Sequence, residues 1–137
     1  MTITHATCVA LGDAGVLIRG PSGSGKSDLA LRLIDQGAML VSDDYCDMRI
    51  YGGHVVARAP TEIAGKIEVR GYGIVDTPFH STIRIRLVVD LVKKENIDRL
   101  PETQTCMIEN IMIPHLSLDP NTPSAAAKIR LIVNSDD

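Results

Sequence analysis

Short apolar segments rich in valine, isoleucine and leucine alternate with glycine-containing turns along most of this chain. Residues 8–11, 15–19 and 38–42 are runs of this kind, and their length is typical of buried β-strands. Residues 83–91 begin with alternating apolar and polar positions and then become mostly apolar, as expected of a strand that enters a core. The pattern therefore predicts a protein rich in β-sheet.

Helical periodicity is confined to two segments. Apolar residues recur three and four positions apart over residues 28–36, and Gly37 stands where a helix often ends. Residues 123–134 contain three consecutive alanines and begin with Pro123, which is tolerated in the first turn of a helix. We expect one helix in each segment.

Several turns predict antiparallel hairpins. Residues 12–15 join the first two apolar runs, and a Gly-Gly pair joins two alternating segments between residues 47 and 58. Residues 66–76 are predicted to form an alternating strand that breaks at two glycines and then resumes. Residues 107–118 are predicted to form a strand region that Pro114 interrupts.

These elements predict an α/β fold with a mixed β-sheet. The run at 38–42 is expected to be a central strand, parallel to the strand at 15–19. Because hairpins outnumber helices, antiparallel strands are expected to make up the rest of the sheet. With 137 residues and 45% hydrophobic content, the chain is expected to form one domain over residues 1–137.

The composition narrows the classes of partner. The net charge is −3 and only 3% of residues are aromatic, which argues against nucleic acid as a partner. The three cysteines are dispersed, without metal-binding spacing. No apolar run is long enough to cross a membrane, and the N-terminal residues lack the features of a signal peptide. We therefore expect no membrane partner and a cytoplasmic location.

A phosphate-binding loop follows the strand at 15–19 and fits the pattern G-x-x-x-x-G-K-[ST]. Its residues are Gly20, Pro21, Ser22, Gly23, Ser24, Gly25, Lys26 and Ser27. The glycines let backbone N–H groups point at a triphosphate, Lys26 reaches its β- and γ-phosphates, and the Ser27 hydroxyl ligates Mg²⁺. A strand before the loop and a helix after it are the context that this motif requires. The sequence thus predicts binding of a nucleoside triphosphate.

Two adjacent carboxylates, Asp43 and Asp44, directly follow the strand at 38–42. Ligands of open α/β sheets bind at the carboxyl ends of strands. Both carboxylates would face the nucleotide if this strand lies beside the one that leads into the loop. One could hold Mg²⁺ and the other could accept a proton from an attacking hydroxyl. The sequence leaves open which does which.

Three further residues carry little functional signal by themselves. Glu68 could be an exposed strand position, and His5 is close to the chain terminus. Arg99 lies in a charged surface segment. Its guanidinium is suited to neutralising a transferring phosphate, but the sequence does not separate it from Arg84 or Arg86.

Taken together, these segments resemble the catalytic domain of HPr kinase/phosphorylase. That family phosphorylates a serine of HPr, the small phosphocarrier protein of the sugar phosphotransferase system. The resemblance runs from residue 5 to about residue 114 and depends on the order of GPSGSGKS, LVSDD and EVRGYGIVD at residues 68–76. The last of these looks like the family's E-x-R-G-x-G-I-x-D, and Asp-Arg-Leu at 98–100 looks like a further family segment.

The resemblance implies ligands and a fold. ATP would be the phosphate donor, bound by Lys26 and the loop backbone, and Ser27 and Glu68 would hold Mg²⁺. The partners implied are an HPr-like protein as substrate and further copies of the chain in a homo-oligomer. The implied fold is the phosphate-loop type shared with phosphoenolpyruvate carboxykinase.

The resemblance also implies catalytic roles. Asp43 or Asp44 would be the base that deprotonates the target serine, and the acid in the reverse reaction. His5 would lie near that aspartate and tune it. Arg99 would support the transferred phosphoryl group.

Two features depart from the family pattern. His5 lies almost at the start, so the chain resembles a short form without the usual N-terminal domain. Residues 113–120 lack the Gly-Arg-Asn that the family uses for phosphorolysis of the phosphoserine, so we expect weak or no reverse activity. The segment after Asp76 is also shortened, which weakens the expectation of the hexameric assembly that is typical of the family.

Two other functions are compatible with the phosphate loop. A kinase of a small metabolite would usually bring a lid and a dedicated pocket, for which this chain is short. A nucleotide-sensing module would bind ATP, hydrolyse little, and keep its cellular function without Asp43 or Asp44.

Overall fold

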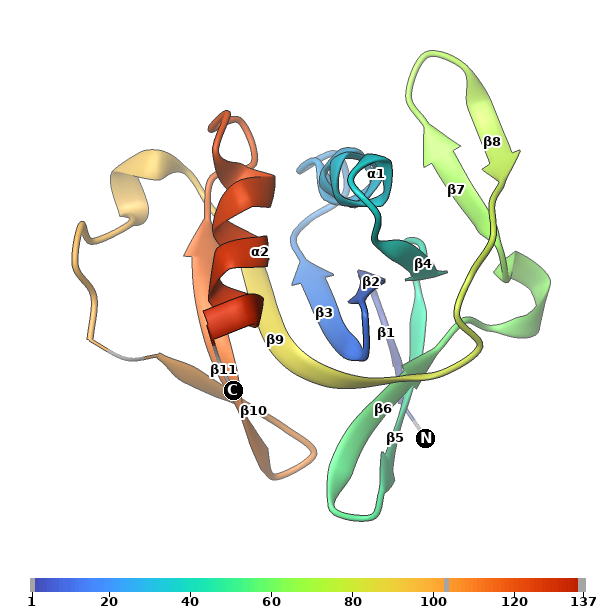
Figure 1. The fold of residues 1–137 in the computed structure, drawn as a ribbon, viewed down its shortest axis with the longest axis horizontal. Coiled ribbons are helices and arrows are strands. Elements are labelled where there is room, and N and C mark those ends of the chain that lie inside the picture. The colour runs from blue at the N-terminus through green and yellow to red at the C-terminus, as the bar shows by residue number, and fades with distance from the viewer. Residues whose placement is uncertain (1, 103, 136–137) are drawn as a thin grey trace.

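The computed structural model describes residues 2–102 and 104–135, whose fold is shown in Figure 1. A curled mixed sheet makes up most of it, with the strand order β1-β5-β6-β9-β3-β2-β4. These strands are β1 (Thr2–Thr4), β2 (Ala6–Leu11), β3 (Ala14–Arg19), β4 (Met39–Ser42), β5 (Cys46–Tyr51), β6 (His54–Arg58) and β9 (Ile83–Leu91). The predicted α/β fold with a mixed sheet is confirmed.

The remaining elements are attached to this sheet. They are the hairpin β10 (Thr105–Ile108) and β11 (Ile111–Leu118), the hairpin β7 (Lys66–Val69) and β8 (Gly73–Asp76), the helices α1 (Lys26–Asp35) and α2 (Ala125–Ser135), and the short 3-10 turns η1 (Thr61–Ile63) and η2 (Lys94–Asn96). Figure 1 shows α1 and α2 on the same side of β3 and β9, with the β7–β8 hairpin projecting beyond α1. Within the described residues, no helix has the length and apolar character to cross a membrane.

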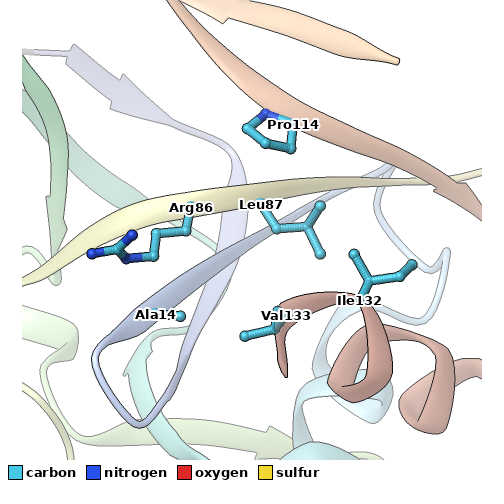
Figure 2. A pocket seen from close by; sticks show the side chains of 6 residues that line it. All are labelled: Ala14, Arg86, Leu87, Pro114, Ile132 and Val133. Atoms are coloured by element: carbon cyan, nitrogen blue, oxygen red, sulfur yellow. The ribbon is translucent and has the colours of Figure 1, made fainter. Parts of the chain in front are cut away.

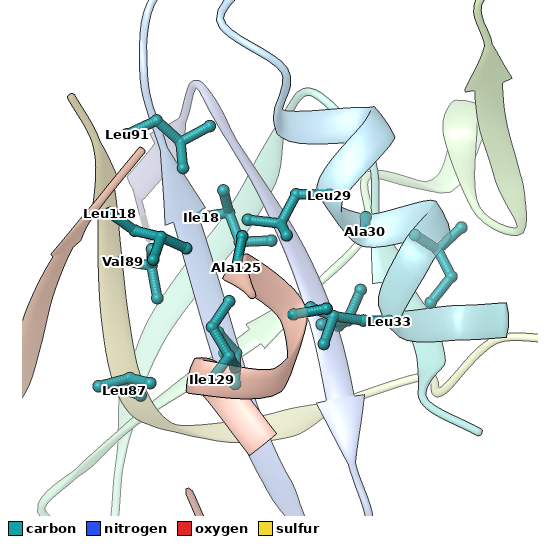
Figure 3. Close-up of a cluster of buried hydrophobic side chains, with 14 of the residues drawn as sticks. Ile18, Leu29, Ala30, Leu33, Leu87, Val89, Leu91, Leu118, Ala125 and Ile129 are labelled. Atoms are coloured by element: carbon teal, nitrogen blue, oxygen red, sulfur yellow. The ribbon is translucent and has the colours of Figure 1, made fainter. Parts of the chain in front are cut away.

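Two core clusters share the sheet. Figure 3 shows the first, in which Leu29 and Leu33 of α1 and Ala125 and Ile129 of α2 gather with Ile18 of β3. All five are at most 1% exposed, so the two helices exclude solvent from this part of the sheet. The second cluster lies on the opposite face, where the sheet curls back on itself. It includes Cys8, Leu17, Met48, Val55 and Val88.

A bulge in β9 changes which of its alternating positions face each cluster. Its register with the parallel strand β3 shifts by one residue, which leaves Arg86 as the extra residue. Ile83 and Ile85 consequently face the second cluster, whereas Leu87 and Val89 face the first. The strict alternation in the sequence does not reveal this change of face.

The prediction that residues 38–42 form a central strand is wrong. β4 ends the strand order and pairs with β2, which separates it from β3. β4 does run in the same direction as β3, since both are antiparallel to β2. Its outer side is covered by a bridge between Leu40 and Phe79, so Leu40 and Val41 are buried as completely as in a central strand.

The region 107–118 also differs from the prediction. It forms parts of two strands, joined at Glu109 and Asn110, which both adopt positive φ angles (50° and 66°). Pro114 does not interrupt β11. It lies opposite Thr105 of β10, one position before β11 begins to pair with β9 at His115. A proline is tolerated where a strand changes partners because its missing N–H is not needed there.

The topology brings several strand ends to one edge of the sheet. β3, β9 and β11 are mutually parallel, and β4 points the same way as β3. Their carboxyl ends therefore lie at the same edge, where β3 continues into the phosphate loop.

Gly15 marks a close approach of β3 to β9 and gives a test of the bulge. A Cβ atom at this position would lie 2.6 Å from the Arg84 carbonyl oxygen and 2.8 Å from Ile83 Cγ2. We expect Gly15→Ala to lower the free energy of unfolding by about 1–3 kcal/mol, because the contact with backbone leaves no room for relaxation.

Urea denaturation measures this loss. Gly52→Ala is the matched control, since it adds a methyl group in open space and carries only the strain of its φ of 58°, about 1 kcal/mol. Equal losses in the two variants would contradict the close approach.

Candidate active site

The phosphate loop is held open by its own backbone. Gly23 and Gly25 have φ angles of 79° and 103°, in the region that glycine adopts without strain. The Ser24 N–H donates to the Pro21 carbonyl at 3.0 Å, and the Leu29 N–H donates to the Gly25 carbonyl at 2.9 Å. No side chain caps α1 at Gly25, so the N–H groups of its first turn are left for an anion.

Lys26 lies inside this loop. The residue is only 5% exposed, and its Nζ donates to the carbonyl oxygens of Gly20 at 2.8 Å and Pro21 at 3.2 Å. Neutral carbonyls are weaker partners for an ammonium than a phosphate oxygen is. Lys26 is therefore placed where an incoming polyphosphate would replace its present partners.

Asp43 joins the loop to three other segments. Its Oδ1 accepts hydrogen bonds from the Ser27 hydroxyl at 2.7 Å and the Thr7 hydroxyl at 3.0 Å, and its Oδ2 accepts the Glu68 N–H at 2.9 Å. The residue is 7% exposed. These bonds connect the end of β4 to α1, β2 and β7 through one carboxylate.

Asp44 points elsewhere and is accessible. Its side chain is 56% exposed, and its Oδ1 accepts a hydrogen bond from His5 Nε2 at 2.7 Å. Its backbone has a φ of 71°, inside a tight turn in which the Tyr45 N–H donates to the Asp43 carbonyl at 2.8 Å. The His5 ring lies 5.1 Å from that of Tyr45. The two adjacent carboxylates are therefore differently placed and differently hydrated.

Thr7 is a site residue that the sequence reasoning missed. Its hydroxyl donates to Asp43 Oδ1 and accepts the Asp44 N–H at 3.1 Å, and the residue is fully buried. One hydroxyl thus fixes both acids. The available signal was a polar residue in an apolar strand, between Ala6 and Cys8, but the strand was predicted to begin only at Cys8.

The donors near the loop fit a magnesium ion. The Ser27 hydroxyl and the Asp43 carboxylate already touch. Glu68 contacts this carboxylate only through its main-chain N–H, and within the described residues its exposed side chain makes no hydrogen bond or ion pair. Such oxygen donors suit Mg²⁺, which is often held by one or two carboxylates together with phosphate oxygens and water. Among residues 2–102 and 104–135, no group of three or more histidine, cysteine or acidic side chains is placed to hold a metal ion, here or elsewhere.

Arg99 is not joined to these residues. It is exposed in the irregular segment after η2, and no hydrogen bond or ion pair of its guanidinium is found in the described part of the chain. The η2 turn is instead held by Asp119, whose carboxylate accepts the Lys94 N–H at 3.0 Å. The role of Arg99 stays a prediction.

The cavity in Figure 2 does not mark this site. Its volume is about 30 Å³, enough for about one water molecule, and Ala14, Arg86, Pro114 and Ile132 are among its lining residues. Ala14 is the first residue of β3, whereas the phosphate loop follows the last. The candidate chemistry therefore belongs to the phosphate loop and not to this small cavity.

Comparison with known proteins shows the family of this chain. The family model of the HPr serine kinase C-terminal domain matches residues 1–134. The chain belongs to this family. The Hpr(Ser) kinase/phosphatase of Coxiella burnetii has a similar solved structure, with a TM-score of 0.87 and 28% identity, covering 98% of this chain and 95% of that one.

Curated relatives are longer than this chain. The HPr kinase/phosphorylase of Leptothrix cholodnii is 38% identical over 106 residues, which are 72% of this chain and 33% of the relative. That of Clostridium beijerinckii is 44% identical over 75 residues, 55% of this chain and 25% of the relative. The aligned part of this chain thus spans about a third of these family members or less.

A second polar cluster, which we call the strand-end network, lies just before the loop and consists of Arg19, Asp90, Gln104 and His115. Arg19 donates to both Asp90 oxygens, from Nε at 2.8 Å and from Nη2 at 2.9 Å. His115 Nε2 contacts Asp90 Oδ2 at 2.6 Å, and its Nδ1 contacts Gln104 Oε1 at 3.0 Å. The network joins β3, β9 and β11.

The network shifts the pKa of its members. Burial alone would raise the pKa of Asp90, but the hydrogen bonds from Arg19 and His115 outweigh burial and leave that pKa below its ordinary value. The hydrogen bond to Asp90 raises the pKa of Arg19. Burial raises the pKa of the neighbouring Cys106 thiol, which therefore stays neutral beside the network.

Thr7→Val tests the link between the two acids. Valine fills the same volume but leaves the buried Asp43 carboxylate without one of its donors, so we expect the free energy of unfolding to fall by about 1–3 kcal/mol. Thr7→Ser keeps the hydroxyl and should retain most of the stability. Urea denaturation of the wild type and both variants measures this difference. Equal stability of the valine variant and the wild type would contradict the role of the Thr7 hydroxyl as a donor to Asp43.

The lowered pKa of Asp90 predicts how stability depends on pH. The ionised carboxylate stabilises the fold fully above the ordinary aspartate pKa of about 3.9, and this contribution is lost as the pH falls through the lower folded-state value. Asp90→Asn removes the titration. Urea unfolding from about pH 5.5 downwards should therefore show a stability difference between wild type and variant that shrinks in acid. A difference that stays constant with pH would refute the stabilising role of the Asp90 carboxylate.

Proposed function

We propose that this chain is a cytoplasmic kinase that transfers the γ-phosphoryl group of ATP to a serine hydroxyl of an HPr-like phosphocarrier protein. The supporting observation is the meeting of Ser27 and Asp43 at 2.7 Å beside the phosphate loop, with the accessible Asp44–His5 pair next to it. The family and the names of the relatives support the choice of acceptor.

The loop would bind and orient the donor. Backbone N–H groups between Gly20 and Gly25 and the N-terminus of α1 would surround the phosphates, and Lys26 would exchange its two carbonyl partners for phosphate oxygens. Phosphoryl transfer depends mainly on such positioning and on neutralising charge.

Magnesium would be held near Ser27, Asp43 and Glu68. When bound, the ion neutralises charge on the donor phosphates. The chain's own contribution is to fix the Ser27 hydroxyl against a carboxylate that Thr7 and the Glu68 N–H already orient.

Asp44 is the better candidate for the base. Asp43 is buried and already accepts three hydrogen bonds, whereas Asp44 is open to an incoming acceptor. Asp44 would take the proton of the serine hydroxyl while the serine oxygen bonds to the γ-phosphorus. The bond between that phosphorus and the β–γ bridging oxygen breaks, and ADP leaves. His5 would orient Asp44, and Arg99 would neutralise the transferred group.

Substituting the two aspartates should have different effects on serine phosphorylation and on nucleotide binding. Asp44→Asn should lower the rate of serine phosphorylation by about 10²–10⁴-fold while nucleotide still binds, because only the proton acceptor is lost. Asp43→Asn should also weaken the magnesium-dependent part of nucleotide binding. Asp13→Asn, in the exposed turn between β2 and β3, is the matched control and should leave both quantities unchanged.

Mass spectrometry of HPr after incubation with ATP, Mg²⁺ and each variant measures the transfer, and calorimetry measures nucleotide binding. Absence of serine phosphorylation by the wild type would reject the proposed function. Full activity of Asp44→Asn would reject its role as the base.

A further inference from the structure

Two members of the strand-end network, one on β3 and one on β9, lie close to the start of the phosphate loop. Arg19 is the last residue of β3 and directly precedes Gly20. Asp90 directly precedes Leu91, whose Cβ would lie 3.3 Å from a Cβ atom placed at Gly20. The start of the loop therefore packs against the strand that carries the central carboxylate of the network.

The third strand reaches the other end of the loop. β11 ends at Leu118, whose carbonyl accepts the Val92 N–H at 2.9 Å, and the chain then passes over the loop at Pro120. The Pro120 ring carbons lie 3.5 Å from the position of a Cβ at Gly25, and Arg32 of α1 donates to the Pro120 carbonyl. One end of the loop thus packs against the last residue of β9, and the other end packs against the segment that follows β11.

The network is built to hold these strands in one arrangement. Arg19 binds Asp90 through two parallel hydrogen bonds, the geometry that fixes a guanidinium most firmly against a carboxylate. His115, whose side chain is 13% exposed, is held on its other side by Gln104. An exposed ion pair contributes little, but charge-assisted bonds at half-buried strand ends constrain the strands they join.

We propose that Asp90 and His115 are positioning residues for nucleotide binding, which act through Arg19 by fixing the ends of β3, β9 and β11 that contact the phosphate loop. The inference rests on the proposed function only in assuming that the loop binds nucleotide. A displacement of about 1 Å in a group that positions the substrate lowers the rate of catalysis strongly. Fixing the strand ends that contact the loop keeps the loop N–H groups in the geometry that binds phosphate.

The test uses three variants of the whole chain. Asp90→Asn removes the charge, His115→Leu removes the donor to Asp90, and His115→Gln retains an amide donor where Nε2 now lies. We expect faster hydrogen exchange at the amides of residues 22–25, and a Kd for magnesium-ADP about tenfold higher, in Asp90→Asn and His115→Leu. His115→Gln should give an exchange rate and a Kd closer to those of the wild type than His115→Leu does.

Arg58→Gln is the control for a general loss of stability. Arg58 pairs with the buried Asp47 between β5 and β6 at 3.0 Å, and these strands do not lead into the loop. This variant should lose stability without faster exchange in the loop or weaker nucleotide binding.

Unchanged loop exchange in both Asp90→Asn and His115→Leu would overturn the inference, as would equal effects of His115→Gln and His115→Leu. Wild-type protein that binds no nucleotide would instead refute the proposed function. The exchange measurement would still decide whether the network positions the loop.

Discussion

The buried carboxylate of Asp43 is the constraint on which the site depends. It is the acceptor for a hydroxyl from α1, a hydroxyl from β2 and a main-chain N–H from β7, which are distant in sequence. A carboxyl group can be buried at low cost only when donors surround it, so the fold must bring these segments together around Asp43. The same requirement places Ser27 and the phosphate loop beside the two acids.

The sheet supplies the frame for this convergence. Parallel strands β3, β9 and β11 end at one edge, and β4 ends there through its pairing with β2 and not with β3. The acids therefore approach the loop from a strand two positions away. Thr7, on the intervening strand β2, bridges that distance with one hydroxyl. An arrangement with β4 beside β3 would have no place for this threonine between the loop and the acids.

Local signals in the sequence predicted much of the fold and the centre of the site. Glycine-containing turns and apolar periodicity located the hairpins β2–β3 and β5–β6 and both helices, because turn chemistry and periodicity are properties of neighbouring residues. Both Asp43 and Asp44 were predicted to face the phosphate loop. Asp43 contacts Ser27 there, whereas Asp44 contacts His5 instead. His5 entered only through the family resemblance, since no local pattern distinguishes a histidine near a terminus.

What the sequence missed depends on long-range pairing. β4 appeared central because its residues are buried on both faces, which a covering segment around Phe79 achieves equally well. Pro114 appeared to interrupt a strand because the change of partner from β10 to β9 is invisible in the chain. Thr7 and the network of Asp90 and His115 acquire meaning only when strands far apart in sequence are adjacent.

The extra residue in β9 restricts how this protein can change in length. Removing Arg86 alone would leave every apolar side chain of the strand in phase with its own core, but would straighten the strand. The curl that encloses the second cluster would then be lost. Removing any one residue from 88 to 90 instead would move the side chains between Arg86 and the removed residue to the opposite face of the sheet. Insertions and deletions are therefore expected to accumulate in the loops on either side of β9 and to spare the strand itself.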